Sequence, residues 1–198
     1  MKHLQTLFIF SLLLTTSVAY AQALPKDILT QLPKSYEVMS SLGGELNDDN
    51  LTDYLVVTHI KNEEAIFKKT GVSSPRPLYI FIQNQNKTFS IAKKNDDVVF
   101  AIDQGGQCDP FEDGMDGLVI KNKFFTVQNS VACGEHWNDF VTFKYDVKLK
   151  DWIFHKHTFQ SFNFADLTNS NDEFAENKLH ITKANPKKVV TFEAYQPH

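Results

Sequence analysis

The chain has little arginine, few cysteines and no long hydrophobic run after its first 21 residues. Arg76 is the only arginine among 198 residues, and 20 basic against 24 acidic residues give a formal net charge of −4. Because nucleic-acid binding relies on clustered Lys and Arg side chains that neutralise phosphates, this balance argues against a nucleic-acid partner. The lack of a second long apolar run argues against a transmembrane protein.

The first 21 residues have the pattern of a cleaved secretory signal. Lys2 gives a positive start, residues 7–16 form a short apolar run, and the tripeptide AYA at 19–21 has the small-x-small form that a signal peptidase accepts. No cysteine lies near this cleavage site, so a lipoprotein is not expected. We predict a mature domain of residues 22–198 that is periplasmic or secreted.

The two cysteines, Cys108 and Cys133, both belong to the mature region. In an oxidising compartment an even pair of cysteines is typical of a disulfide. The bridge would close a loop of about 26 residues, and the chain-entropy description gives a stabilisation of about 3 kcal/mol. A Cys-His nucleophile at "CGEHWND" is not expected, because it would need a free thiolate.

The pattern after the signal predicts an all-β, mainly antiparallel, single domain with one short helix. The segment 24–33 has a proline at or near each end and spaces its apolar residues on one helical side. Downstream, short runs rich in Val, Ile, Phe, Tyr and Thr are separated by hairpin-length gaps at 84–87, 121–123 and 148–151. We also expect strands at 97–102 and 188–195, and polar connections at 61–76 and 163–177. A sandwich or a partial-propeller-like sheet fits these strands.

The stretch "GELNDDNLTDYLVV" at 44–57 has oxygen-bearing groups at alternate positions, as a calcium loop requires. Counted from Glu45, the expected ligands at positions one, three, five, seven and nine are Glu45, Asn47, Asp49, the carbonyl of Leu51, and Asp53. Asn50 takes position six, where a sharp turn usually needs glycine, and asparagine tolerates the left-handed conformation. An Asx-rich turn without metal is the alternative.

The strand after this loop argues against a helix-loop-helix calcium site, as does Val56 where a glutamate would be needed. The loop resembles that of FG-GAP and VCBS-type β-repeats, with Glu45 and Asn50 as departures. Over about residues 32–155 the chain is similar to uncharacterised exported bacterial proteins with a single such loop, through "LPKSYEV", "PRPLYIF", "GGQCDPFEDG" and "FVTFKY". The resemblance implies a β-rich exported protein and no established reaction.

The segment "GGQCDPFEDGMDG" at 105–117 is a candidate partner-binding loop with acidic residues Asp109, Glu112, Asp113 and Asp116. A loop held by a disulfide loses little entropy on binding. The alternative is a plain surface loop, because Asp-Pro and repeated glycine are turn chemistry.

Three histidines could form a zinc site if they converged, although zinc is not the expected ion. His155 and His157 are two apart in a predicted strand, so both should point to one face, and His136 could join them. The sequence contains no nucleophile elbow, phosphate-binding glycine loop or zinc-protease helix.

These patterns favour a non-catalytic, calcium-stabilised domain that binds another protein of the cell envelope. Its most concrete form is a periplasmic inhibitor or immunity protein against a cell-wall-targeting effector. One alternative is an envelope hydrolase or zinc enzyme. Another is a structural or carbohydrate-binding module, for which Trp137 and Trp152 would supply an aromatic platform.

Overall fold

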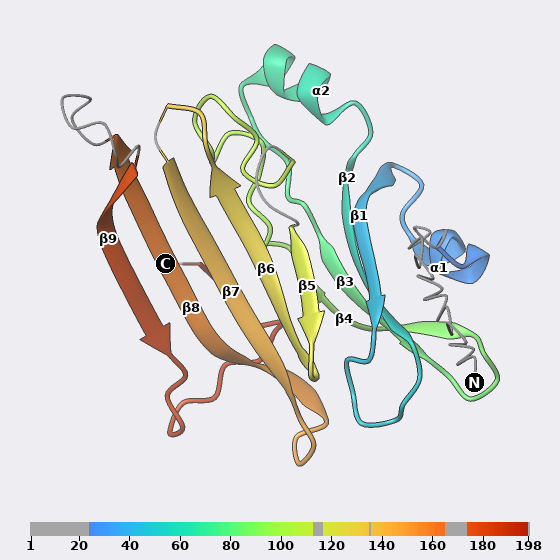
Figure 1. The fold of residues 1–198 in the computed structure, drawn as a ribbon. Coiled ribbons are helices and arrows are strands. Elements are labelled where there is room, and N and C mark those ends of the chain that lie inside the picture. Colours follow the sequence, from blue (N-terminus) through green and yellow to red (C-terminus); the bar gives the residue numbers. More distant parts are fainter. Residues whose placement is uncertain (1–23, 113–116, 135, 165–173, 198) are drawn as a thin grey trace, which may run out of the picture.

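The protein is a single-domain, sandwich-like fold of two antiparallel β-sheets, as predicted (Figure 1). The computed structural model describes residues 24–112, 117–134, 136–164 and 174–197. Sheet A has the order β1-β2-β3-β4, and sheet B has the order β5-β6-β7-β8-β9. The elements are α1 (Lys26–Gln31), β1 (Tyr36–Gly44), β2 (Asp53–Ile60), α2 (Glu63–Thr70), β3 (Leu78–Gln83), β4 (Phe89–Asn95), β5 (Leu118–Lys121), β6 (Phe124–Val131), β7 (His136–Asp146), β8 (Asp151–Phe164) and β9 (Phe174–Lys183).

The three predicted hairpin gaps are confirmed. They join β3 to β4, β5 to β6 and β7 to β8, and each has a residue with positive φ where the chain reverses. Lys87, Asn122 and Lys150 are examples, with φ of 65°, 54° and 50°. Neither helix of the described part is long and apolar enough to cross a membrane.

The segment 61–76 contains a helix that the sequence reading missed. α2 is flanked by Asn62 and Gly71, both in the left-handed conformation, and the Gly71 N–H donates to the Phe67 carbonyl at 2.8 Å. Two glutamates in its first turn and two lysines in its last complement the helix dipole. This helix is short and mostly exposed, so its polar composition resembles that of a connection.

Two predicted strands, 97–102 and 188–195, are not regular strands. Val98 is buried, but its backbone bonds to the side chains of Asn95 and Asn129 instead of to a ladder. Near the C-terminus, the Phe154 N–H donates to the Val190 carbonyl at 2.8 Å, and the chain then turns. Val98, Val99, Phe192 and Tyr195 of these runs are buried, whereas Val189 is 51% exposed, and side-chain amides satisfy part of the backbone.

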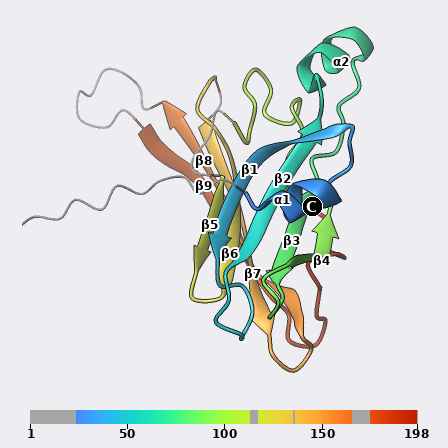
Figure 2. The same ribbon diagram turned by 90° about the vertical axis from the view of Figure 1, so that its right-hand side faces the viewer.

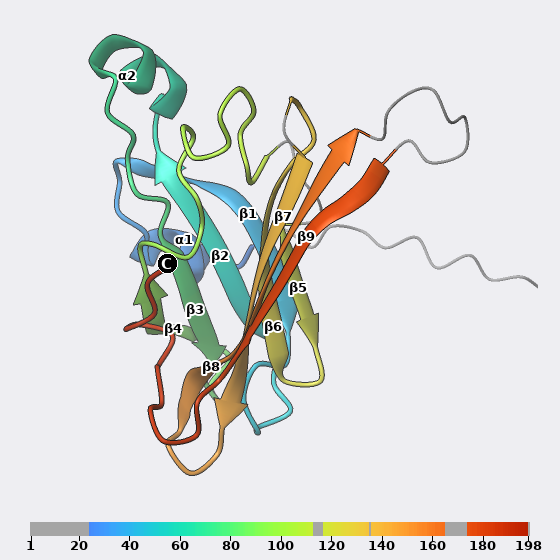
Figure 3. The ribbon, with the colours of Figure 1, turned by 90° about the vertical axis from the view of Figure 1, so that its left-hand side faces the viewer.

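The core between the sheets is rich in aromatic rings. Phe143 stacks on Phe125 at 5.1 Å and meets Phe192 and Tyr195 edge-on at 5.2 and 5.3 Å. Asn95 donates to the carbonyls of Phe192 and Tyr195, which fixes the C-terminal segment beside β4 (Figure 3). The same segment also bonds to β8, where the Phe192 N–H donates to the Trp152 carbonyl at 2.7 Å, so it links β4 to β8.

Candidate functional site

Candidate sites gather at the two ends of the sandwich. The 45–52 loop lies at one end with the β5–β6 and β7–β8 turns, and α2 lies at the other end with the cysteine-linked segments (Figures 1 and 2). We refer to these as the loop end and the helix end.

Asp53 is the most constrained residue of the predicted calcium loop. It is fully buried at the start of β2, and its carboxylate accepts the N–H groups of Leu46 and Gln83, each at 3.0 Å. Burial raises the pKa of Asp53 to about 6, against the lowering effect of these two hydrogen bonds. A negative charge at Asp53 is therefore costly unless a cation shares the loop.

The middle of the loop consists of consecutive Asx turns. The Asn47 side chain accepts the Asp49 N–H at 3.2 Å, and the Asp49 carboxylate accepts the Leu51 N–H at 2.9 Å and the Asn47 amide at 2.9 Å. Asn50 has φ of 61°, so it adopts the left-handed conformation expected at position six. These bonds are those of the turn alternative, yet each oxygen keeps a second lone pair for a cation.

Glu45 provides the loop's orphan acceptor. Its Oε1 is buried without a hydrogen-bond partner and lies 4.0 Å from the ammonium of Lys123, which contacts Asp48 directly. Asp48 lies between the ligand positions and is half exposed. The loop is anchored on the other side by Trp152, whose indole N–H donates to the Leu46 carbonyl at 2.8 Å.

The loop thus offers oxygen ligands, and the supporting observations are a glutamate oxygen without a hydrogen bond and a buried aspartate with a raised pKa. Across the described residues there is no group of three or more His, Cys, Asp or Glu side chains arranged to hold a metal. The three proposed carboxylate ligands, Glu45, Asp49 and Asp53, therefore do not form such a group by themselves, and the amide of Asn47 and the carbonyl of Leu51, which the finding does not cover, would have to complete the site. Calcium binding therefore stays a proposal.

At the helix end, Arg76 is the centre of a buried ionic network. The side chain is 1% exposed and donates to Glu63 of α2 at 2.7–3.1 Å, to Asp109, and to the Phe100 carbonyl at 3.1 Å. Burial alone would lower the pKa of Arg76, but the hydrogen bonds with Asp109 and Glu63 outweigh it and raise that pKa. Burial would raise the pKa of Asp109, but the hydrogen bonds from Arg76 and from the N–H groups of Phe111 and Glu112 lower it. His59 extends the network at 3.3 Å from Glu63 and 3.4 Å from Glu37.

This network forms one wall of an acidic cleft of about 610 Å³ between α2 and the 102–112 segment. We call it the helix-end cleft. Its charged lining is five acidic side chains against two basic ones: Glu37, Glu63, Glu64, Asp109 and Glu112 against Lys68 and Arg76. Since the two basic residues are outnumbered, the cleft suits a cationic group.

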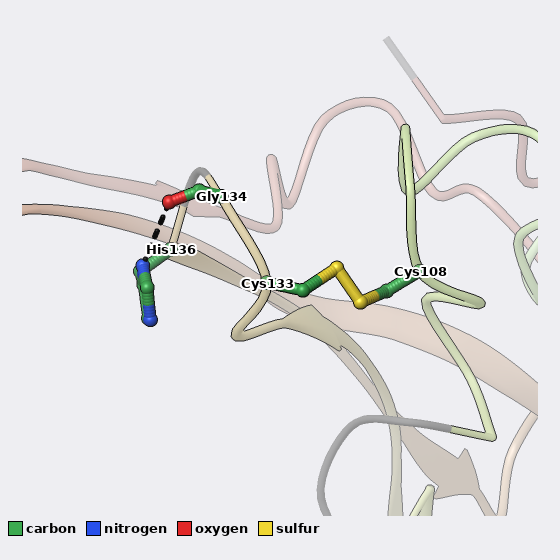
Figure 4. Close-up of a disulfide and its surroundings, with 4 residues drawn as sticks. All are labelled: Cys108, Cys133, Gly134 and His136. Carbon is green, nitrogen blue, oxygen red and sulfur yellow. Dashed lines mark hydrogen bonds between the residues drawn. A yellow bond between two sulfur atoms is a disulfide. The ribbon is translucent and has the colours of Figure 1, made fainter.

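The predicted disulfide between Cys108 and Cys133 is present, with a Cα–Cα distance of 6.1 Å (Figure 4). It ties the 102–112 segment to the turn before β7. Within the predicted partner loop, Asp109 is held by Arg76 and by the N–H groups of Phe111 and Glu112, whereas Glu112 is exposed. Asp113 and Asp116 lie outside the described residues.

The three histidines do not come together. A β-bulge in β8 pairs Lys156 with Thr142 and Phe154 with Phe143, which leaves His155 as the extra residue. His155 packs against Phe124, while His157 pairs with Asp139 at 2.7 Å. His136 bonds to the Gly134 carbonyl at 3.1 Å (Figure 4). The expectation that His155 and His157 share a face is wrong, because strand alternation fails at the bulge.

The two tryptophans have different roles. Trp152 is 3% exposed and belongs to the core. Trp137 is partly exposed and lies in a row with Phe100 and Phe159, at ring distances of 6.0 and 6.4 Å. Only Trp137 can therefore contribute to an aromatic platform.

Sequence reasoning missed the Arg76 network and the cleft. The available signal was the single arginine between two prolines before an apolar strand, at "PRPLYIF".

Comparison of the chain with protein-family models, with curated proteins and with solved structures finds no significant match.

Proposed function

We propose that the protein is an exported, non-catalytic domain that binds another envelope protein at its helix end. The observation that carries this proposal is the acidic helix-end cleft, whose two walls are fixed by the buried Arg76 network and by the disulfide. A surface that is rigid before binding loses little entropy in the complex. The most concrete version is a periplasmic inhibitor or immunity protein that covers a cell-wall-attacking enzyme.

The chemistry of the cleft specifies the partner's side of the contact. Val72, just beyond α2, is 68% exposed, and Glu64 and Glu112 are exposed at the rim. We expect a Lys or Arg side chain of the partner to enter the cleft while an apolar neighbour covers Val72. Exposed rim charges would speed association, and the buried carboxylates would fix the register.

The double charge reversal Glu64→Lys/Glu112→Lys should weaken partner binding at least about tenfold, because it places two ammonium groups where the partner's cation approaches. The partner is first captured from envelope extract with wild-type protein and identified, and its Kd is then measured with both purified proteins. Asp96→Lys/Glu193→Lys makes the same charge change outside the cleft. Equal weakening by both doubles would reduce the effect to net charge and contradict the proposal.

A carbohydrate-binding module is the second candidate, and the row of Phe100, Trp137 and Phe159 favours it. It predicts retention on envelope polysaccharide that depends on Trp137. Capture of polysaccharide with no protein partner would favour this candidate over the first.

We also propose that calcium stabilises the loop end. Glu45, Asn47, Asp49 and Asp53 would supply side-chain oxygens, and Leu51 its carbonyl. The ion would supply positive charge beside the buried Asp53 carboxylate and the unbonded Glu45 oxygen.

Without calcium, the free energy of unfolding should fall by about 2–3 kcal/mol between pH 3 and pH 7 because of Asp53. Its pKa is about 6 in the folded protein against an ordinary 3.8. The folded state therefore holds the proton more tightly, and this stabilisation, complete below pH 3.8, is lost as the pH rises through 6. At pH 7, calcium at 100 times its Kd should restore about 3 kcal/mol. Chemical unfolding with chelator or with calcium measures both effects.

Asp53→Asn should remove both the pH dependence and the response to calcium. Asp48→Asn is the matched control in the same loop, because Asp48 is half exposed and lies between ligand positions. If the wild-type protein shows the pH dependence but its stability does not respond to calcium, Asp53 is a buried carboxylate and the calcium proposal is wrong.

A further inference from the structure

A cavity of about 670 Å³ lies beside the bulge in β8, where β9 ends and another segment takes over as the neighbour of β8. The Ala184 N–H donates to the His155 carbonyl at 3.0 Å, and the Phe154 N–H donates to the Val190 carbonyl at 2.8 Å. Between these two bonds the chain loops outward over residues 185–189. The cavity between this loop and the bulge has the size of a small-molecule site.

The charge of the cavity is opposite to that of the whole chain. Its lining includes four lysines and one acid, namely Lys144, Lys156, Lys183, Lys188 and Asp146. The chain as a whole carries a formal net charge of −4. One Asp146 oxygen already accepts the N–H groups of Lys148 and Leu149 at the β7–β8 turn. The cavity is therefore a local basic site on an acidic protein.

These four ammonium groups lack protein counter-ions: within the described part of the chain, none is within ion-pair distance of a carboxylate. Lys156 and Lys183 are moreover direct cross-strand partners in the β8–β9 ladder. Like charges directly opposite one another destabilise a sheet. An anion between the two side chains would relieve that repulsion.

The pKa of His155 is affected by the same positive charges. Burial lowers its pKa, and the charges of Lys144 and Lys156 lower it further. The ring packs edge-on against Phe124 at 5.0 Å, and His155 lines the cavity.

Most of the remaining lining of the cavity is apolar, with Asn185 as a polar exception. Ile153, Phe154, Pro186, Val189 and Val190 contribute to its lining, and Val189 is 51% exposed. Leu179 and Ile181 are 50% and 48% exposed. Because they are four and two positions before Lys183 in β9, they lie on the same face of the strand as Lys183. An aliphatic stripe therefore continues from the lysines along the strand.

We propose that this cavity binds an anionic amphiphile, a molecule with a carboxylate or phosphate on an aliphatic chain. The lysines would bind the anionic group, and Ile153, Val189 and Val190 would contact the chain. The lysines by themselves would also bind a free inorganic anion. Such an anion would leave the aliphatic lining exposed to water, whereas an aliphatic chain would bury it.

The test is calorimetric titration of the full mature protein with decanoate below its micelle concentration. Decanoate should bind with 1:1 stoichiometry and at least about tenfold more tightly than decanol, decyltrimethylammonium or inorganic phosphate. Lys156→Gln/Lys183→Gln should weaken decanoate binding about tenfold or more. Lys26→Gln/Lys34→Gln, which makes the same charge change beside α1, should leave it unchanged.

The Tm of the variant shows whether a loss of decanoate binding could instead come from misfolding. At low salt, Lys156→Gln/Lys183→Gln should have an unchanged or higher Tm, since it removes a like-charge pair. A folded variant that binds decanoate as well as wild type would overturn the proposal, as would equal binding of decyltrimethylammonium. Binding to phosphatidylglycerol vesicles but not to monomeric decanoate would also overturn it, in favour of a membrane surface.

Discussion

Replacement of Arg76 by methionine is expected to lower the free energy of unfolding by about 3–5 kcal/mol. The substitution keeps much of the aliphatic volume and removes the guanidinium that contacts both Glu63 and Asp109. Glu63 is 5% exposed, and the Asp109 side chain is 11% exposed. Glu63 and Asp109 would then lose the guanidinium that balances their buried charges, and this loss costs much more than an exposed ion pair contributes. Chemical unfolding at pH 7 measures the loss.

The matched control removes all three charges. In Arg76→Met/Glu63→Gln/Asp109→Asn no uncompensated charge remains, so much of the lost stability should return. Arg76→Lys should have an intermediate effect, because an ammonium keeps the charge but cannot form the paired hydrogen bonds of the guanidinium. If the triple variant is as unstable as Arg76→Met, packing and not charge carries the role of Arg76.

The features that could be predicted from the sequence are those that neighbouring residues determine. Turn residues at 84–87, 121–123 and 148–151 define hairpins because their own backbone conformations reverse the chain. The left-handed conformation of Asn50 is local in the same way. The cysteine pair could be predicted because there were only two candidates.

The features that could not be predicted depend on distant contacts. Arg76 meets Asp109 across 33 positions, and no local pattern reports that distance. The bulge at His155 adds one residue to a strand whose composition is otherwise regular, so strand alternation misplaced its side chain. The basic cavity forms where the hydrogen-bonded neighbour of β8 changes from β9 to the 184–190 segment. The spacing of the lysines along the chain does not indicate this change of neighbour.

Removal of the disulfide in Cys108→Ser/Cys133→Ser should lower the free energy of unfolding by about 3 kcal/mol. The bridge spans 25 positions, so its absence gives the unfolded chain more conformational freedom. The folded segment keeps two other anchors, since Asp109 still bonds to Arg76 and the Ser130 N–H still donates to the Pro110 carbonyl at 2.7 Å. The native cleft should therefore persist.

Because the disulfide acts mainly on the unfolded chain, its removal should change stability but not partner binding. Well below its Tm, the serine variant should bind the partner within about twofold of wild type, while its unfolding midpoint in urea falls. Wild-type protein unfolded in the presence of a reductant should reproduce the variant's midpoint. If binding were lost in the folded variant, the disulfide would position the cleft directly, and the Arg76 network alone would not hold the 102–112 segment in its binding conformation.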